Sequence, residues 1–340
     1  MKKYLFMNRQ KGVLILTWKE VEELLDMAEV IQSVEMAFKE KGTRKVQMPP
    51  KIYLNFDRYD GDLRAMPAYL STLGIAGVKI VNSHSKNRNI GLPTVMALIE
   101  LVEPKNGRPL ALLDGTKITS FRTGAASAVA TKYLARKDSK VLGIIGAGVQ
   151  SQTQIDAISK IINIEEINVF DADKKASERL TRFVADKGIP SKVLIKDSAK
   201  EAVIGSDIVS TATPSRSPII FVDWLKAGVH INAIGADAPG KRELDPEILK
   251  KGKIIVDDTE QTMHSGEINY PISKGILLKE DIYAELGDII VGKKMGRTSE
   301  ADITIFDSTG LAILDVAVGY MIFQKAIKEN RGIVIDILNS

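Results

Sequence analysis

The sequence predicts an α/β protein of two domains, one with a doubly wound parallel sheet and one of α+β type with a mainly antiparallel sheet. Three observations support this. The chain has 340 residues, more than the ~250–300 at which a single core stops growing. From residue 140 onward, short apolar strands alternate with helical stretches, as in a parallel sheet covered on both faces. Before that point, β-branched runs are separated by Gly, Pro and Asn, as in antiparallel sheets.

The composition is typical of a globular protein. Charged residues make up 26% of the chain and hydrophobic residues 44%. The net charge is +4, but lysines are interspersed with glutamates, so we expect no nucleic-acid partner. The lack of cysteine excludes disulfides and thiolate sites and favours the reducing cytoplasm. The start MKKYLFMNRQKG is basic, but its apolar run is too short for a signal peptide, and no run of ~18 apolar residues follows, so we expect no membrane partner.

The first element is a helix over residues 17–42. Thr17 and Glu20 form a capping box, and Gly42 is expected to end the helix. The runs KIYLNF, AGVKIVNS, TVMALIELVEP and PLALLDG then predict the strands of the antiparallel sheet. The apolar positions of the helix recur at helical spacing: Val21, Leu24, Leu25, Ala28, Ile31, Val34 and Phe38.

The second domain begins after the Ala-rich helix in TSFRTGAASAVATKYLARKDSK. The strands VLGII, INVF, SKVLI, DIVSTAT, HINAIGA and KIIVDD alternate with helices, which requires right-handed crossovers and a parallel sheet. The segment DITIFDSTGLAILDVAVGYMIFQKAIKEN adds one strand and a long helix. We expect this helix to lie back on the first domain.

The turn at residues 146–151, GAGVQS, follows an apolar strand and opens a helix. Gly146 permits the tight turn, Gly148 allows the backbone to approach a pyrophosphate, and the helix N-terminus offers N–H donors. Ser151 replaces the usual third Gly or Ala, but is small enough for close packing. The pattern predicts a Rossmann-type dinucleotide site formed by Gly146, Ala147, Gly148, Val149 and Gln150.

Asp171 follows the next strand, about twenty residues beyond the turn, where a carboxylate accepts hydrogen bonds from the ribose hydroxyls. A carboxylate there repels a 2′-phosphate, and no Arg follows it directly, so NAD is favoured over NADP. The alternative is that Asp171 only caps the next helix.

Several segments together resemble the ornithine cyclodeaminase/mu-crystallin family, most closely its archaeal alanine dehydrogenase branch. They are QMPPKIYLNF, GDLRAMPAYL, GVKIVNSHSKN, GLPTVMALI, SFRTGAASAVA, GIIGAGVQSQ, INAIGADAPGKRELD and TIFDSTGLAILDVAV. The resemblance implies a homodimer. It assigns residues 1–122 and 314–340 to substrate binding and dimerisation, and residues 123–313 to a Rossmann NAD-binding domain.

The resemblance also implies a substrate site in the first domain. Lys51 and Arg64 would clamp a carboxylate, with the guanidinium of Arg64 providing a bidentate fork. Lys79 lies in an apolar strand, where loss of solvent would lower its pKa and make it a usable acid or base. The alternative for each is a solvated side chain beside a strand.

Further positions follow from the same resemblance. Arg122 would contact a cofactor phosphate, although a surface arginine is the alternative. Asp237 ends the fifth parallel strand and would be catalytic or orient ammonia, although a helix cap is the alternative. The other cofactor-side positions are Ala172, Asp173, Thr211, Ala212, Ala236, Ala238, Lys241 and Ser308; Asp237 also belongs to this set.

The implied activity is NAD-dependent, reversible deamination of L-alanine to pyruvate and ammonia. The cyclodeaminases carry a glutamate in place of Arg64, and a cation there suits a small 2-oxo acid better than the ammonium of ornithine. Cyclodeamination, imine or ketimine reduction, and a non-catalytic mu-crystallin-like ligand-binding role remain alternatives. We expect no catalytic metal, because the three histidines His84, His230 and His264 are isolated.

Overall fold

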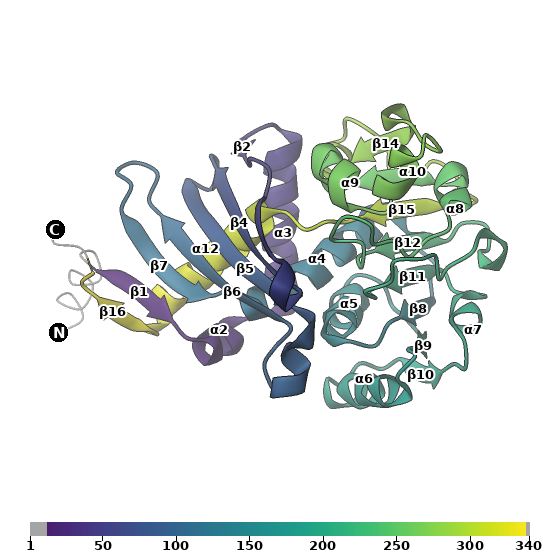
Figure 1. Ribbon diagram of the computed structural model, residues 1–340, viewed down its shortest axis with the longest axis horizontal. Helices are drawn as coiled ribbons and strands as arrows, with labels where there is room; N and C mark the ends of the chain where they lie inside the picture. The colour runs from purple at the N-terminus through teal and green to yellow at the C-terminus, as the bar shows by residue number, and fades with distance from the viewer. Residues whose placement is uncertain (1–11, 338–340) are drawn as a thin grey trace. The chain divides into compact units, whose positions relative to one another are not determined.

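The computed structural model describes residues 12–337, except the side chain of Arg88. The basic start that we read as too short for a signal peptide, residues 1–11, lies outside the described residues. The chain divides into two compact units (Figure 1). Unit 1 comprises Met1–Arg122 and Leu311–Ser340, and unit 2 comprises Thr123–Gly310. Helix α4 (Thr116–Leu134) begins in unit 1 and ends in unit 2.

Unit 1 contains a mainly antiparallel sheet, as predicted. Its order is β16-β1-β7-β6-β5-β4-β2, and β3 also pairs with β4. The pairs are antiparallel except for β1 with β7, which is parallel. The short strands β1, β2 and β16 were not predicted from the sequence. The strands are β1 (Val13–Leu16), β2 (Val46–Gln47), β3 (Ile52–Phe56), β4 (Gly61–Leu70), β5 (Ile75–His84), β6 (Val95–Val102), β7 (Pro109–Asp114) and β16 (Ile333–Ile335).

The prediction of one helix over residues 17–42 is wrong, because the chain forms two helices there. The capping box at Thr17 is present and starts α2 (Trp18–Leu24). Leu25 is extended, and the Asp26 carboxylate accepts hydrogen bonds from the N–H groups of Ala28 and Glu29 to start α3 (Met27–Gly42). Asp26 therefore caps a new helix instead of continuing the first, a local competition that apolar spacing does not reveal.

One face of the unit 1 sheet is covered by helices. Helix α12 (Ala312–Glu329) packs against β4, β5, β6 and α3 (Figure 1), as the sequence analysis expected. On the covered face, the cross-strand neighbours Met66, Lys79 and Ile99 are buried. On the opposite face, the cross-strand row through Ile80 and Leu98 remains 43% and 53% exposed, respectively.

Unit 2 contains the doubly wound parallel sheet. Its order is β10-β9-β8-β11-β12-β15-β13-β14, with parallel pairs throughout. From β8 the chain runs outward through β9 to β10, and from β11 it runs the other way through β12 to β13 and β14 before β15 returns between β12 and β13. The switch point therefore lies between β8 and β11. Ligands of such sheets bind at the carboxyl ends beside the switch point. The strands are β8 (Val141–Ile145), β9 (Glu166–Phe170), β10 (Lys192–Ile195), β11 (Ile208–Thr211), β12 (His230–Ala233), β13 (Lys253–Val256), β14 (Ile282–Glu285) and β15 (Thr304–Asp307).

Short helices connect these strands. No element was predicted from the sequence between β13 and β15, where the structure forms short helices and β14. Elements of so few residues carry no readable periodicity. No helix in the described part of the chain is both long and apolar enough to span a membrane. The helices of unit 2 are α5 (Val149–Ser159), α6 (Lys174–Asp186), α7 (Ala199–Val203), α8 (Pro246–Lys251), α9 (Thr259–Ser265), α10 (Asn269–Ser273) and α11 (Leu286–Ile290).

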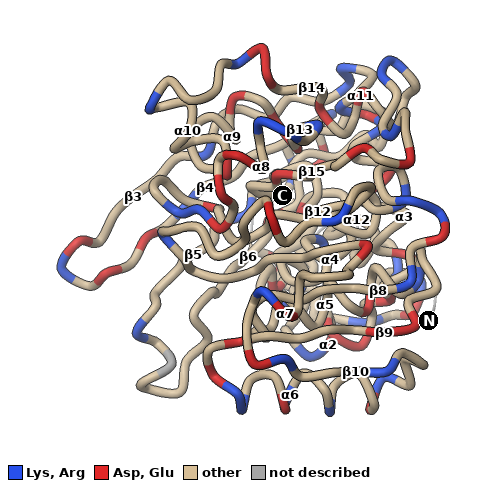
Figure 2. Tube along the Cα trace, turned by 90° about the vertical axis from the view of Figure 1, so that its right-hand side faces the viewer, with Lys and Arg blue, Asp and Glu red and all other residues tan. Residues whose placement is uncertain are grey.

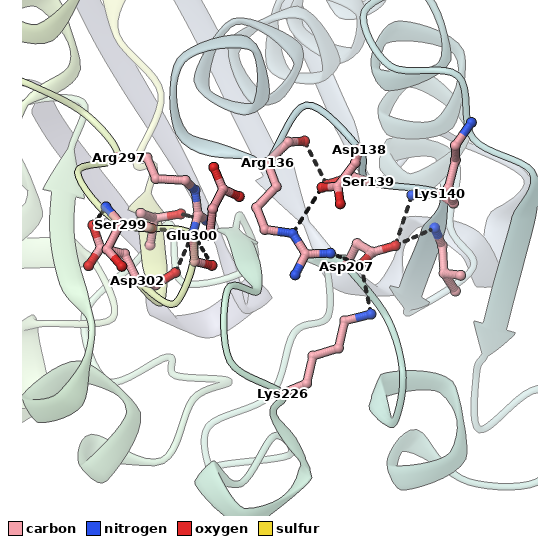
Figure 3. Close-up of polar contacts among 12 residues, drawn as sticks. Arg136, Asp138, Ser139, Lys140, Asp207, Lys226, Arg297, Ser299, Glu300 and Asp302 are labelled. Carbon is pink, nitrogen blue, oxygen red and sulfur yellow. Dashed lines mark hydrogen bonds and ion pairs between the residues drawn. The ribbon is translucent and has the colours of Figure 1, made fainter.

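A polar network joins the amino ends of the unit 2 strands (Figure 3). Asp207, just before β11, accepts hydrogen bonds from the N–H groups of Lys140 and Val141 at 2.8 and 2.9 Å. It also forms ion pairs with Arg136 Nη2 at 2.9 Å and Lys226 Nζ at 2.7 Å. Burial raises the pKa of Asp207, but the contacts with Lys226, Lys140 and Val141 outweigh it and hold the pKa below its ordinary value. The network lies at the end of the sheet opposite the predicted cofactor turn.

Charges of both signs are interspersed on the surface segments. Figure 2 shows alternating Lys/Arg and Asp/Glu segments on α6 and along the loop between β3 and β4. That loop contains Asp57, Arg58 and Asp60. This agrees with the interspersed charges in the sequence.

Candidate active site

Two of the predicted substrate-side cations lie on one face of the unit 1 sheet. Arg64 in β4 pairs with Val81 in β5, and Met66 pairs with Lys79. Directly paired residues of neighbouring strands point to the same face of a sheet. Arg64 and Lys79 are therefore diagonal neighbours on the face that α12 covers.

Lys79 is 1% exposed, and its pKa is lower than that of an ordinary lysine. Its Nζ lies 2.6 Å from Oδ2 of Asp315 and donates to the hydroxyl of Thr119 at 3.4 Å. Burial lowers its pKa, Asp315 partly restores it, and the nearby positive charges of Arg122 and Lys51 lower it further, to about 7. An amine with this pKa can both accept and donate a proton near neutral pH.

Asp315, in the first turn of α12, was missed by the sequence analysis. It is fully buried, and while Oδ2 pairs with Lys79, Oδ1 accepts a hydrogen bond from Nε of Arg122 at 3.0 Å. A signal was present, because Asp315 is the lone charge in the apolar run TGLAILDVAVG. A buried carboxylate requires a charged partner, so this residue pointed to a site.

Arg64 already binds a carboxylate within its own strand. Nε and Nη2 of its guanidinium donate to Oδ1 and Oδ2 of Asp62 at 2.8 and 2.9 Å. The guanidinium carbon also lies 5.4 Å from the centroid of the Tyr53 ring. The side chain is 11% exposed. The guanidinium thus binds the Asp62 carboxylate through two parallel hydrogen bonds, the geometry in which arginine binds carboxylates.

Lys51 immediately precedes β3 and is partly exposed. Its charge contributes to the lowered pKa of Lys79. Unit 1 therefore brings together Lys51, Arg64, Lys79 and Arg122, all four of the predicted residues that it carries.

The predicted dinucleotide turn of unit 2 has the expected backbone. Gly146 has φ +89°, and a Cβ there would lie 2.9 Å from the carbonyl oxygen of Ala212, so glycine is required. Gly148 is the N-cap of α5 and supplies no side-chain acceptor. A Cβ on Gly148 would meet no atom within 4 Å. The space beside the Cα of Gly148 is therefore open, which allows a dinucleotide phosphate to approach the backbone at the start of α5.

Ser151, which departs from the usual Gly or Ala, is buried and donates its hydroxyl hydrogen bond to the carbonyl oxygen of Gly146. The side chain thus ties the helix to the turn. At the open end of the same helix, Val149 is 64% exposed and Gln150 follows it.

Asp171 contacts the turn directly. Its Oδ2 accepts a hydrogen bond from the N–H of Ala147 at 2.6 Å, and its Oδ1 accepts one from the backbone N–H of Asp173 at 2.8 Å. The N-cap of α6 is Asp173, whose carboxylate accepts from the N–H of Lys175. The alternative of Asp171 as that helix's cap therefore does not apply. Ala172 lies between the two acids.

The remaining predicted residues follow the carboxyl ends of β11, β12 and β15 in unit 2. In the loop after β12, Asp237 Oδ1 forms an ion pair with Nζ of Lys241 at 2.6 Å, and Ala236 and Ala238 flank Asp237. Thr211 ends β11 and precedes Ala212. Ser308, after β15, donates to Oδ2 of Asp257 at 3.1 Å. All these residues lie at the same edge of the sheet as the glycine turn.

The sequence profile of the ornithine cyclodeaminase/mu-crystallin family matches residues 12–330. The chain belongs to the ornithine cyclodeaminase/mu-crystallin family. An alanine dehydrogenase of Archaeoglobus fulgidus is 50% identical over 319 residues, which cover 94% of this chain and 97% of the relative.

Two solved structures of ornithine cyclodeaminase/mu-crystallin type align with nearly the whole chain. An archaeal alanine dehydrogenase dimer with bound NAD has a TM-score of 0.92 and 49% identity, covering 96% of this chain and 100% of that one. The Δ1-pyrroline-2-carboxylate reductase of Thermococcus litoralis, in complex with NADH and L-proline, has a TM-score of 0.92 and 41% identity, covering 95% and 100%. The resemblance to the family and the fold class predicted from the sequence are confirmed.

The described residues of this family member contain no group of three or more acidic, His or Cys side chains suited to a metal ion. His230 is buried between Thr304 and Asn232, with its ring nitrogens 3.0 and 3.2 Å from their side-chain oxygens. Burial lowers its pKa to about 3. His230 is therefore a neutral core residue that joins β12 to β15.

Proposed function

We propose that the protein is an NAD-dependent alanine dehydrogenase, which interconverts L-alanine with pyruvate and ammonia. The observation that carries the proposal is the pair Arg64 and Lys79 on one face of the unit 1 sheet. It combines a carboxylate-binding fork with an amine of pKa about 7. The relative at 50% identity, an alanine dehydrogenase, supports the choice of substrate.

In this proposal, Arg64 and Lys51 bind the substrate carboxylate. Lys79 then handles the protons at the neighbouring carbon. In the deamination direction, neutral Lys79 removes a proton from water as it adds to the iminium carbon, and its ammonium form passes that proton to the nitrogen. Neutral Lys79 then takes the remaining hydroxyl proton as the C–N bond breaks, so that the carbonyl forms and ammonia leaves. In the reverse direction, the ammonium of Lys79 protonates the carbonyl oxygen as ammonia adds. Neutral Lys79 then takes a proton from the added nitrogen and passes it to the hydroxyl group, which leaves as water. Asp237 is proposed to hold ammonium through its carboxylate.

The proposed cofactor site in unit 2 consists of the turn Gly146–Gln150, Asp171 and the loops that follow β11, β12 and β15. The N–H groups at the start of α5 would hold the pyrophosphate, and Asp171 would accept hydrogen bonds from ribose hydroxyls. NAD, when bound, supplies the hydride acceptor for the substrate carbon. Arg122 is proposed to contact a cofactor phosphate.

We further propose a homodimer formed through the uncovered face of the unit 1 sheet. Ile52, Ile80 and Leu98 lie in one cross-strand row of that face and are 62%, 43% and 53% exposed. An apolar sheet face of this kind is typical of a protein interface. The variant Ile80→Glu should produce monomers by light scattering, and a dimer that persists in this variant would contradict the proposed interface.

The activity is tested by following NADH absorbance with pyruvate and ammonium. We expect oxidation that requires both compounds, and none with pyruvate alone. A panel of larger 2-oxo acids defines the size of the substrate side chain. A protein that binds NADH but oxidises it with no 2-oxo acid or cyclic imine would favour the non-catalytic, ligand-binding alternative.

A second candidate is the reduction of a cyclic imine such as Δ1-pyrroline-2-carboxylate. The relative in complex with NADH and L-proline supports it, at the same TM-score as the alanine dehydrogenase. The cyclic imine carries the same carboxylate beside C=N, so Arg64 and Lys51 would bind it in the same way. NADH oxidation by the cyclic imine without ammonium, at a higher kcat/KM than with pyruvate and ammonium, would select this candidate.

A further inference from the structure

Glu243 is a fully buried acid in the segment between β12 and α8 of unit 2. Its Oε2 accepts hydrogen bonds from the hydroxyl of Thr211 at 2.6 Å and from the N–H of Gly235 at 2.8 Å. Its Oε1 accepts one from the N–H of Thr213 at 2.6 Å. One carboxylate thus receives three donors from two different loops. Burial raises the pKa of Glu243, and these hydrogen bonds oppose the increase.

Glu243 joins the ends of β11 and β12. Strand β11 flanks the switch point, and β12 is its neighbour in the sheet. Thr211 ends β11 and Thr213 follows it, and Gly235 follows β12 two residues before Asp237. At Gly235, a Cβ would lie 2.3 Å from the carbonyl oxygen of Thr213 and 2.5 Å from the carboxyl carbon of Glu243. The contact between the loops is therefore so close that only glycine fits.

The glycine turn after β8 rests on the same loop. A Cβ at Gly146 would lie 2.9 Å from the carbonyl oxygen of Ala212 and from the methyl carbon of Thr213. The strand-end segments after β8, β11 and β12 therefore pack together, and Glu243 hydrogen-bonds two of them. A shift of Thr213 would move the surface against which the glycine turn packs.

A second buried acid holds the backbone of Glu243. Glu267 accepts hydrogen bonds from the N–H of Glu243 at 2.8 and 3.0 Å and from the N–H of Leu244 at 2.9 Å. Burial and the negative charges of Glu243 and Asp307 raise the pKa of Glu267 well above its ordinary value. Burial also raises the pKa of Asp307, to about 8, with Asp257 and Glu243 adding to the increase.

Glu243 and Glu267 therefore differ in what they need from the protein. Both oxygens of Glu243 accept hydrogen bonds, so an amide in its place loses the acceptor on one side. Oε2 of Glu267 alone accepts from the N–H groups of both Glu243 and Leu244, so the oxygen of an amide can keep both contacts. Glu243→Gln is therefore expected to disturb the contacts between the loops, whereas the matched variant Glu267→Gln is expected to leave them nearly unchanged.

We propose that Glu243 is a positioning residue for the dinucleotide: it holds the loops after β11 and β12 in the arrangement that the cofactor requires. The inference rests on the proposed binding of NAD. Glu243 acts through Thr211, Thr213 and Gly235 and is not itself a catalytic residue.

The test compares NADH binding to the full-length variants Glu243→Gln, Glu267→Gln and Glu247→Gln by fluorescence titration. Glu247 is exposed on α8 and serves as the control. Glu243→Gln places an amide N–H against one of the donors and should raise the Kd of NADH at least tenfold. Its KM for NADH should rise, while its KM for the second substrate changes less than twofold. Glu267→Gln and Glu247→Gln should bind NADH within threefold of the wild type.

A second pair of variants applies if Glu243→Gln fails to fold. Thr211→Val removes the hydroxyl that donates a hydrogen bond to Glu243, and Thr211→Ser keeps this hydroxyl. We expect Thr211→Val to weaken NADH binding at least threefold and Thr211→Ser to restore it. Wild-type affinity in Glu243→Gln, or in Thr211→Val, would overturn the inference, as would equal losses in Glu243→Gln and Glu267→Gln. Because the titration needs no second substrate, a wild type that does not bind NADH would instead contradict the proposed function.

Discussion

The carboxylate of Asp315 lies 2.6 Å from Nζ of Lys79, and both side chains are buried. Burial destabilises the charged form of Lys79 and is the largest influence on its pKa. The carboxylate of Asp315 stabilises that charged form and so raises the pKa. Asp315 also contacts Arg122. The proton affinity of Lys79 therefore depends on a balance between one anion and its neighbouring cations.

We expect the pH profile of kcat/KM to show an inflection near 7 that belongs to Lys79. In Asp315→Asn the negative charge is lost, so the pKa of Lys79 falls and the inflection moves to lower pH. Glu329→Gln, at an exposed position of the same helix, is the control and should leave the profile unchanged. An inflection that stays in place in Asp315→Asn would show that it belongs to another group.

Replacing Lys79 should abolish the proton chemistry while the cofactor still binds. Lys79→Ala should lower kcat by at least ~10²-fold, the scale of a general acid or base. Lys79→Arg retains the charge, but a guanidinium does not titrate near neutral pH, so it should be equally slow and lack the inflection near 7. Fluorescence titration with NADH and circular dichroism check that both variants bind and fold. Near wild-type turnover in Lys79→Ala would make Asp237 the leading candidate for the acid or base.

Arg64→Met should raise the KM for pyruvate and leave the affinity for NADH nearly unchanged, because Arg64 is proposed to contact only the substrate carboxylate. The loss of a bidentate, charge-assisted contact should cost roughly 2–4 kcal/mol in transition-state binding. Arg58→Met, at an exposed position before the same strand, serves as the control. If kcat/KM for pyruvate is the same in Arg64→Met as in the wild type, Arg64 is not the carboxylate ligand.

Asp171 should make the enzyme prefer NADH to NADPH, since its carboxylate repels a 2′-phosphate. Asp171→Asn should weaken NADH binding and reduce the discrimination against NADPH, because the repelling charge is removed while an oxygen remains for the N–H of Ala147. The comparison uses kcat/KM for both cofactors, with the exposed Glu178→Gln on α6 as control. A wild-type preference for NADPH above tenfold would contradict the assignment.

Asp207 should stabilise the fold in a pH-dependent way without affecting the cofactor site. Its pKa in the folded protein lies below the ordinary value of 3.8, so its contribution is fully present above that value and is lost as the pH falls through the folded pKa. Asp207→Asn leaves Arg136 and Lys226 without this carboxylate (Figure 3) and should cost about 1–3 kcal/mol at pH 7.

Thermal or urea unfolding of the wild type and Asp207→Asn between pH 3 and pH 7 measures this contribution. The difference in stability should narrow as the pH decreases. The side chain of Asp138, in the same network, is 75% exposed, so Asp138→Asn should change the stability little. A constant difference across the pH range would mean that packing, and not the charge of Asp207, is responsible.

Local sequence signals predicted the elements that depend on neighbouring residues. The capping box at Thr17, the glycine turn after β8 and the alternation of strands and helices from residue 140 are such features, because their causes lie within a few residues. The break at Asp26 was missed although its cause is also local, because apolar spacing continues across it. The short elements between β13 and β15 carry too few residues for a periodic pattern.

The sequence by itself determined the two kinds of sheet and the dinucleotide turn. Its family motifs marked Lys79 and Arg64 as candidates, and the spacing after the glycine turn marked Asp171. Only the tertiary structure decided what those side chains contact. Asp315 reaches Lys79 because α12 returns across the unit 1 sheet, and Glu243 joins two strand ends because the parallel sheet brings them to one edge. The physical reason is that the energy of a buried charge depends on partners distant in sequence, whereas periodicity and capping reflect only local contacts.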